Sequence, residues 1–333
     1  MKNVKRRDVY SAVEVCPERE MEEKKKILIF GLGFTGSRLA ESLVRKNWTV
    51  VGTVRNRKET ETLRNVEVVI FDVGEFKRVR EILRSGTITH VLITAPPMKT
   101  GEGDPVLAVL KEDLRKTNLK WCGYLSTTGV YGDCGGEVVD ETAKLNPVSK
   151  RSERRVIAEQ AWSKLGLPIH IFRLPGIYGP GRGTVARVRQ GRTKPILKKG
   201  QVFNRVHVDD IVSALELSMD KPSKIIPAVF NVVDDLPAPQ HVVTAYAYKI
   251  LNREPIPDPV CYCSAYHSIH PSKSTSMNIV LCFKHRNLSR MQRCQRWHEV
   301  STRPADGQQR KSSRRSWVGS QSILHTWKDF ELR

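Results

Sequence analysis

The stretch "KKKILIFGLGFTGSRLAESLVRKNWTVVGTVRN", residues 24–56, decides the fold of this chain. The apolar run at 27–30 is typical of a short buried strand, and the β-branched run at 49–54 indicates a second one. Between them Leu39, Leu43 and Val44 recur at the spacing of an amphipathic helix. A glycine-rich turn therefore joins a strand to a helix, and a second strand closes the unit, which predicts a parallel βαβ arrangement.

The turn carries the pattern G-x-G-x-x-G through Gly31, Gly33 and Gly36. The first glycine permits the tight turn, the second lets a pyrophosphate approach the backbone, and the third lets the helix pack on the strand. Phe34 and Thr35 begin the helix, whose free N–H groups and positive dipole end favour phosphate. In this strand–turn–helix context, the pattern predicts a dinucleotide site made by these five residues.

The end of the second strand indicates which dinucleotide is bound. An NAD site usually has an acidic residue there for the ribose 2′-hydroxyl, whereas this chain has Thr53, Arg55 and Arg57. Arginine suits a 2′-phosphate, so the cofactor is expected to be NAD(P), with NADP(H) favoured over NAD(H). The alternative is that these arginines are solvated loop charges.

Two further strands extend the pattern. "VEVVIFDV" at 66–73 leads to Asp72, a candidate contact for adenine, and "HVLITAPP" at 90–97 leads to Ala95 and Pro96. Strands that alternate with helical segments predict an α/β fold with a parallel, doubly wound sheet.

Four later motifs, in the same order, complete a resemblance to a known family. They are "YLSTTGVYGD" (124–133), "RLPGIYGPGR" (173–182), "NRVHVDDIVSAL" (204–215) and "FNVVDDLPAP" (230–239). With the glycine-rich turn they resemble the extended short-chain dehydrogenase/reductase family of sugar-nucleotide epimerases and dehydratases, and its atypical branch most. The resemblance covers residues 25–257. It implies a Rossmann sheet with a small C-terminal substrate lobe, and oxidoreductase or epimerase activity on a small hydroxyl- or carbonyl-bearing substrate.

The resemblance also implies two site residues. Thr127 occupies the family's Ser/Thr position and is expected to hydrogen-bond a substrate hydroxyl or carbonyl. The alternative for Thr127 is ordinary hydrogen bonding at a strand end. Pro175 belongs to the stretch that passes the nicotinamide in the family.

"RSERRVIAEQ", residues 151–160, lies where the family has its catalytic Tyr-x-x-x-Lys. Alignment on Ala158 and Glu159 places Arg151 at the tyrosine position and Arg155 at the lysine position. A cation at Arg155 can still contact the nicotinamide ribose. Arginine at 151 stays protonated at any useful pH, so it cannot exchange a proton as a phenol does.

The proton must then move through another group, or the chain carries out no hydride chemistry. Tyr131, Tyr178, His207 and a water molecule are the candidate acids and bases. Without such chemistry the chain would be a non-catalytic NADP(H)-binding sensor or scaffold. His207 with Asp209 and Asp210 is not expected to hold a metal, because adjacent residues do not converge; one of the aspartates is expected to cap the following helix.

Charge and composition restrict the partners. The net charge is +21, of which residues 258–333 contribute +8, from thirteen Lys/Arg and five Asp/Glu. The basic segment 181–200 is either a solvated surface or a lobe that attracts a phosphate-bearing substrate. It lacks interleaved aromatic residues, so no nucleic-acid partner is expected. No stretch has the roughly 20 apolar residues of a membrane span, so we expect a soluble protein. A homodimer is one arrangement that we consider.

Seven scattered cysteines, an odd number, point to a reducing compartment. The cytoplasm is expected, with a plastid or another organelle as the alternative. Residues 1–24 lack the apolar core of a secretory signal, and we expect them to form a flexible tail.

Residues 258–333 change character and are expected to be a basic, aperiodic and disordered tail. Their cysteine and histidine spacings fit no standard zinc site, so no metal is expected. One hypothesis is that this tail translates a retained intron and then a shifted reading frame. Val260-Cys261 can be encoded as GTATGT, which resembles an intron donor, and an acceptor-like CAG is available at Gln292. Sequencing of the spliced transcript tests this hypothesis.

Overall fold

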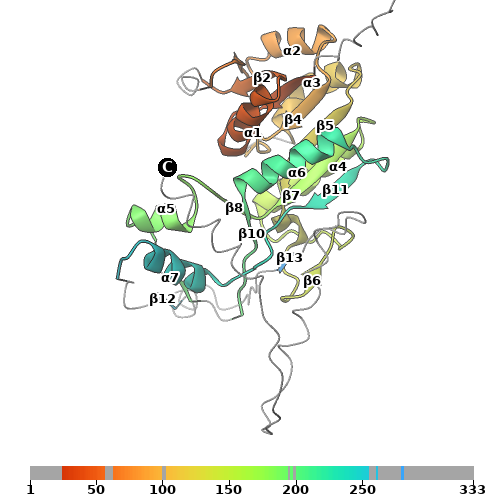
Figure 1. Cartoon of the computed structure of the whole chain (residues 1–333). Helices are drawn as coiled ribbons and strands as arrows, with labels where there is room; N and C mark the ends of the chain where they lie inside the picture. The colour runs from red at the N-terminus through yellow and green to blue at the C-terminus, as the bar shows by residue number, and fades with distance from the viewer. Residues whose placement is uncertain are drawn as a thin grey trace, which may run out of the picture. The chain divides into compact units, whose positions relative to one another are not determined.

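The computed structural model describes residues 25–56, 63–99, 103–193 and 200–254, and the short strands at 196–197, 260–261 and 279–280. Its centre is a seven-stranded, fully parallel sheet in the order β11-β7-β5-β4-β1-β2-β3 (Figure 1). The strands are β1 (Lys26–Phe30), β2 (Thr49–Val54), β3 (Val66–Ile70), β4 (His90–Ile93), β5 (Trp121–Thr127), β7 (Ile169–Leu174) and β11 (Ala228–Asn231). The predicted doubly wound Rossmann sheet is confirmed.

The strand order reverses at β1, which pairs with β2 on one side and with β4 on the other. Ile29 lies beside Gly52 of β2 and beside Leu92 of β4. In an open parallel sheet such a reversal leaves a crevice beyond the carboxyl ends of the strands, where ligands bind. The glycine-rich turn follows β1 directly, so it lies at this crevice.

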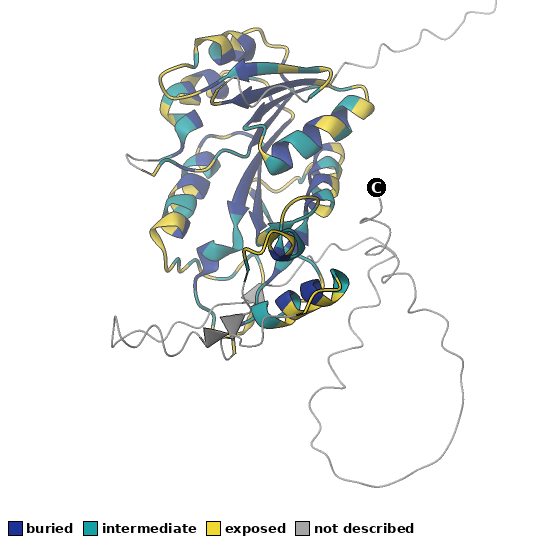
Figure 2. Ribbon diagram, turned by 90° about the vertical axis from the view of Figure 1, so that its left-hand side faces the viewer, coloured by how far each residue is buried: buried dark blue, intermediate teal, exposed yellow. Residues whose placement is uncertain are grey.

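Helices cover both faces of the sheet. They are α1 (Phe34–Arg45), α2 (Lys77–Arg84), α3 (Pro105–Arg115), α4 (Lys150–Ser163) and α6 (Val208–Asp220). Alternate side chains of β1 enter opposite cores, as the pleat requires. Leu28 and Phe30 join the cluster formed with α2, α3 and α4, whereas Ile27 and Ile29 join the cluster formed with α1 and α6. The inner strands are accordingly buried along most of their length, and the helices expose their outer sides (Figure 2).

A smaller lobe is built from the later segments. In it β8 (Gly176–Tyr178) pairs in parallel with β10 (Arg205–His207). Helix α5 (Thr184–Arg189) packs on α7 (Gln240–Ile250) through a small core of Val188, Ala247 and Tyr248. The remaining elements are the 3₁₀ helix η2 (Thr128–Tyr131) and the dipeptide strands β6 (Val138–Val139), β9 (Ile196–Leu197), β12 (Val260–Cys261) and β13 (Ile279–Val280).

Several predictions concern residues that the structure does not describe. The N-terminal tail 1–24 and Arg57 lie outside the described residues, as does the segment 258–333 apart from β12 and β13. Those two strands pair with β9 and β6 respectively. Within the described part of the chain, no helix is both long and apolar enough to cross a membrane.

Candidate cofactor-binding site

The glycine-rich turn fits tightly against its surroundings at two of its three glycines. Gly31 has φ +103°, a left-handed conformation that favours glycine, and a Cβ added there would lie 2.5 Å from the Thr94 hydroxyl oxygen. A Cβ at Gly36 would collide with the carbonyl oxygen of Gly31. These two glycines therefore let β1, the turn and α1 approach one another closely.

Gly33 is different, because a Cβ added there would meet nothing within 4 Å. Gly33 is exposed and is the N-cap of α1, and no side chain caps that helix end. The first helical hydrogen bond runs from Ser37 N to Gly33 O at 2.8 Å. The N–H groups of Phe34, Thr35 and Gly36 precede it and have no acceptor among the described residues. The turn thus presents open space and three free donors, which is the form of an anion-binding site.

Two threonines hold the turn from the neighbouring strands. Gly31 N donates to Thr53 Oγ1 at 3.0 Å, and Leu32 N donates to the Thr53 carbonyl oxygen at 2.8 Å. From the other side, the Thr94 hydroxyl donates to Gly31 O at 2.7 Å. Thr53 is buried, so it supports the turn and does not face a ribose. Thr94 was not identified from the sequence. Its position directly after the apolar strand β4 indicates a place at the carboxyl ends of the strands, where ligands bind.

The expected adenosine contacts lie at the carboxyl ends of neighbouring strands. Arg55 is exposed directly after β2, and Asp72 is exposed just beyond β3, with its carboxylate accepting from Val73 N at 2.8 Å. Because β2 and β3 are parallel neighbours, both residues lie at the same edge of the sheet. The structure brings them to one edge, as expected for residues that contact one adenosine.

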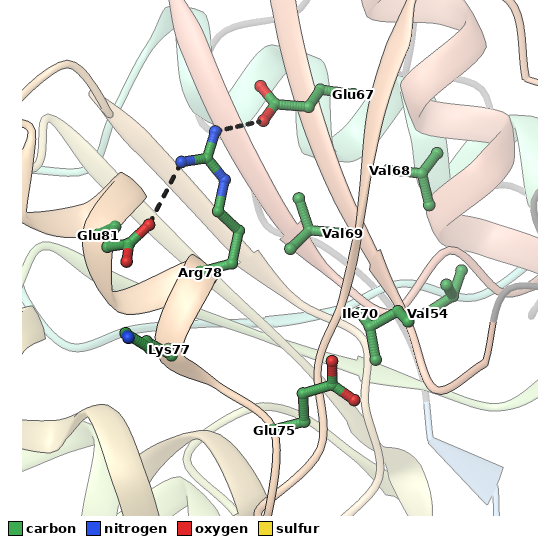
Figure 3. A pocket seen from close by; sticks show the side chains of 9 residues that line it. All are labelled: Val54, Glu67, Val68, Val69, Ile70, Glu75, Lys77, Arg78 and Glu81. Carbon is green, nitrogen blue, oxygen red and sulfur yellow. Dashed lines mark hydrogen bonds and ion pairs between the residues drawn. The ribbon is translucent and has the colours of Figure 1, made fainter.

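A cleft runs along the edge strand β3 and helix α2 (Figure 3). Arg78 crosses it and forms ion pairs with Glu67 at 3.4 Å and with Glu81 at 3.3 Å. The residues that line it are Val54, Glu67, Val68, Val69, Ile70, Glu75, Lys77, Arg78 and Glu81. Val54 and Ile70 are the last residues of β2 and β3, so one end of the cleft borders the position expected for adenosine.

The other predicted cofactor residues also follow the carboxyl ends of strands of the sheet. Ala95 N donates to Phe30 O at 3.0 Å, which holds the segment after β4 against the start of the turn. Pro96 follows and is exposed. Pro175 is half-buried between β7 and β8.

Thr127 ends β5 and is half-buried. Its hydroxyl oxygen accepts a hydrogen bond from Gly129 N at 3.2 Å and caps η2. This is the strand-end hydrogen bonding expected as the alternative for Thr127. The hydroxyl hydrogen stays available as a donor, because only the oxygen lone pair is used in this contact.

The two arginines of the predicted catalytic helix have different surroundings. Helix α4 begins after Ser149, and Arg151 in its first turn is exposed and makes no hydrogen bond or ion pair with another described residue. Arg155 is half-buried, and its Nη1 donates to Leu125 O at 2.5 Å and to Tyr124 Oη at 3.2 Å. Arg155 is therefore anchored on the carboxyl half of β5, whereas Arg151 points to solvent.

The prediction that Tyr131 is a candidate acid or base is wrong. Its side chain is 1% exposed, its hydroxyl donates to Asn231 Oδ1 at 2.8 Å, and it accepts from Arg173 Nη1 at 2.8 Å. Burial raises the pKa of this phenol. The hydroxyl is thus committed to the core, out of reach of a substrate.

His207 and Tyr178 face one another at the ends of β10 and β8, with ring centroids 5.2 Å apart. His207 is the N-cap of α6, and its Nδ1 accepts from Asp209 N at 3.2 Å. The prediction that Asp209 or Asp210 caps this helix is therefore wrong. Asp209 instead accepts from Arg38 Nε at 2.8 Å, which joins α6 to α1. An imidazole nitrogen can replace a carboxylate as a cap because it too offers a lone pair.

The pKa of the Tyr178 phenol is higher than that of a free tyrosine. Burial, together with the carboxylates of Asp234 and Asp210, raises the pKa of Tyr178 to about 12. It is protonated at neutral pH, as a free phenol is, and the raised pKa makes it a weaker proton donor. No group of three or more His, Cys, Asp or Glu side chains in the described ranges is arranged to hold a metal.

Comparison with known proteins agrees with this geometry. Residues 27–232 match the model of the NAD dependent epimerase/dehydratase family. Protein YeeZ of Escherichia coli is 28% identical over 248 residues, which are 69% of this chain and 85% of that protein. A conserved protein of unknown function from Silicibacter pomeroyi is 38% identical with a TM-score of 0.67, over 78% of this chain and 90% of that one.

A more distant match shows the same fold. UDP-glucuronic acid 4-epimerase from Bacillus cereus, in complex with UDP-glucuronic acid and NAD, superposes with a TM-score of 0.59 at 20% identity. The match covers 69% of this chain and 84% of the epimerase. The family match spans most of the described sheet, including the glycine-rich turn. The chain belongs to the NAD dependent epimerase/dehydratase family.

Proposed function

We propose that this chain binds NADP(H) and acts as an oxidoreductase or epimerase-type enzyme on a small hydroxyl- or carbonyl-bearing substrate, such as a sugar nucleotide, without the usual Tyr-x-x-x-Lys pair. The observation that carries the proposal is the open space over Gly33, beside the three free N–H groups of Phe34, Thr35 and Gly36. The residues present fit a dinucleotide, because the donors are directed to where its diphosphate would lie.

Arg55 supports the choice of NADP(H). It is exposed at the end of β2, and no acidic residue of the described chain pairs with it. A guanidinium there suits a 2′-phosphate, with which it can form bidentate hydrogen bonds. Asp72, exposed just beyond the adjacent strand, would contact the adenine.

Bound nicotinamide would supply a hydride donor or acceptor. The chain's own residues would then orient the substrate and move a proton. Thr127 would donate its free hydroxyl hydrogen to a substrate oxygen at the end of β5. Arg155, fixed on Leu125 O, would keep a positive charge beside the nicotinamide ribose.

The proton would pass through Tyr178, His207 or water, because Arg151 cannot exchange one and Tyr131 is buried. Tyr178 carries its proton at neutral pH, and its raised pKa makes it a weaker acid than a free phenol. Replacement by phenylalanine, Tyr178→Phe, removes the hydroxyl and keeps the ring. If Tyr178 is the acid, turnover falls by a factor of about 10²–10⁴ while NADPH affinity stays constant.

The decisive test is titration of the protein with NADPH and with NADH, followed by nicotinamide fluorescence. Saturable binding of NADPH, tighter than that of NADH, is expected. If neither nucleotide binds, the proposal fails. If both bind with equal affinity, the cofactor site stands and the preference for NADP(H) is wrong.

A non-catalytic NADP(H)-binding sensor or scaffold is the second candidate. The observation that favours it is Arg151, which is exposed at the position of the family's tyrosine and contacts no other described residue. Assays with sugar nucleotides separate the two functions. NADPH binding with no turnover of any UDP- or dTDP-sugar would favour the sensor.

A further inference from the structure

The loop that follows β8 reaches the glycine-rich turn. The Arg182 guanidinium carbon lies 5.0 Å from the centroid of the Phe34 ring, within the range of a cation–π contact. A Cβ added at Gly179 would lie 3.3 Å from Phe34 Cζ, so the loop backbone also approaches this ring. Phe34 is the first residue of α1 and one of the three with a free N–H group.

This loop has a defined conformation that presents Arg182. Gly179 N donates to Arg182 O at 3.1 Å, and Arg182 N donates to Gly179 O at 2.9 Å, which closes a tight turn. Gly181, inside this turn, has φ +71°, where glycine is favoured. The position of Arg182 is thus set by its own backbone as well as by the ring of Phe34.

Among the described residues Arg182 has no counter-ion, unlike Arg38 of α1. Arg38, on the same helix as Phe34, is paired with Asp209 at 2.8 Å. Arg182 is exposed and forms no ion pair or side-chain hydrogen bond with any residue of the described chain. Within the described part of the chain, the Arg182 guanidinium thus keeps its N–H donors available beside the N-terminus of α1.

We propose that Arg182 pairs with the diphosphate of the bound dinucleotide. This inference rests on the proposed function. One residue, Phe34, would serve the ligand twice: its backbone N–H faces the diphosphate, and its ring supports the arginine. Guanidinium and phosphate form charge-assisted, often bidentate hydrogen bonds, which are about twice as strong as neutral ones. The pairing would also fix the loop from Gly179 to Gly183, which leads into α5 of the smaller lobe.

ADP-ribose is the probe, because it has the diphosphate and adenosine but no nicotinamide. Its dissociation constant is measured by calorimetry on the full chain for the wild type, Arg182→Gln and Arg64→Gln. Arg64 is an exposed residue just before β3, at the amino ends of the parallel strands, whereas the turn lies at their carboxyl ends; its substitution therefore removes the same charge away from the turn. We expect about tenfold weaker binding for Arg182→Gln and no change for Arg64→Gln.

Two further variants test the geometry. Arg182→Lys keeps the charge but not the planar fork, and should recover part of the affinity. Phe34→Leu keeps the backbone N–H but removes the aromatic face, and should weaken binding about threefold. The melting temperature without ligand should differ by no more than about 4 °C between the wild type and Arg182→Gln, because an exposed cation–π contact contributes only about 0.5–1 kcal/mol.

The outcomes separate the two proposals. A wild type that binds neither NADPH, NADH nor ADP-ribose defeats the proposed function. A wild type that binds ADP-ribose, with equal affinity for Arg182→Gln, overturns only the role of Arg182. An equal loss in Arg64→Gln also overturns it, since net charge would then explain the effect.

Discussion

Arg173 and Glu159 form an ion pair that is almost completely buried between β7 and α4. Arg173 Nη2 lies 2.8 Å from Glu159 Oε2, and the two side chains are 6% and 4% exposed. The Ser126 hydroxyl donates to Glu159, and Arg173 Nη1 donates to Tyr131 Oη. This network joins β5, β7 and α4 about one helical turn after Arg155, so it fixes α4 against the sheet.

Removing one partner of this pair should be costly. Arg173→Met leaves a buried carboxylate without its counter-ion, which should lower the free energy of unfolding by about 3–5 kcal/mol. Urea unfolding at neutral pH measures the loss. The double variant Arg173→Met with Glu159→Leu removes both charges and should recover most of it. If the double variant is as unstable as the single one, packing and not charge explains the effect.

Substitution of Gly36 and of Gly33 should have different effects on stability and on NADPH binding. Gly36→Ala forces a methyl group against Gly31 O, so it should lower the free energy of unfolding by about 1–3 kcal/mol. The methyl group of Gly33→Ala meets nothing in the protein, so the free energy of unfolding should stay within about 1 kcal/mol of the wild type, which is the cost of alanine at an N-cap. NADPH affinity should fall, because the methyl group occupies the ligand's space. Unfolding curves and fluorescence titrations of both variants check this. Unchanged NADPH affinity in Gly33→Ala would contradict the site.

The turn and the sheet were predictable because backbone sterics fix them. Gly31 and Gly36 are required by close approach, and apolar periodicity reports which residues form strands. Roles set by tertiary contact were not predictable. Thr53 supports the turn. His207 caps α6 because the helix begins at Val208, which puts Asp209 inside the first turn, where it pairs with Arg38 of α1, a helix far away in the sequence. No local pattern in the sequence contains that pairing.

Two buried histidines should make the fold acid-sensitive. Burial lowers the pKa of His90 and of His170 from 6.5 to about 4, with Lys25 and Lys120 contributing at His90. The unfolded chain therefore takes up these protons first, and stability present at pH 7 is lost as the pH falls from about 6.5 to about 4. Each histidine contributes at most about 1.4 kcal/mol per pH unit.

Asp234 opposes this trend. Burial raises its pKa to about 6, so the folded chain binds that proton first and gains stability as the pH falls below about 6. Asp104 and Asp210, whose pKa burial raises, act in the same direction as Asp234. The lowered pKa of Asp113 and of Asp209 beside arginines adds instead to the loss in acid. Urea unfolding at pH 7, 6, 5 and 4 should show a shallower loss for His170→Gln than for the wild type. Parallel curves for the two proteins would show that His170 does not titrate in this range.

Arg55 should set the choice of nucleotide. Arg55→Ser removes the guanidinium expected at the 2′-phosphate, so the dissociation constant for NADPH should rise about 10- to 100-fold. NADH has no 2′-phosphate, so its affinity should stay within about twofold of the wild type. Arg64→Gln serves as the control for net charge and should change neither value. Fluorescence titration of each variant with both nucleotides gives the ratio directly, and an equal loss for NADPH and NADH would place Arg55 outside the 2′-phosphate site.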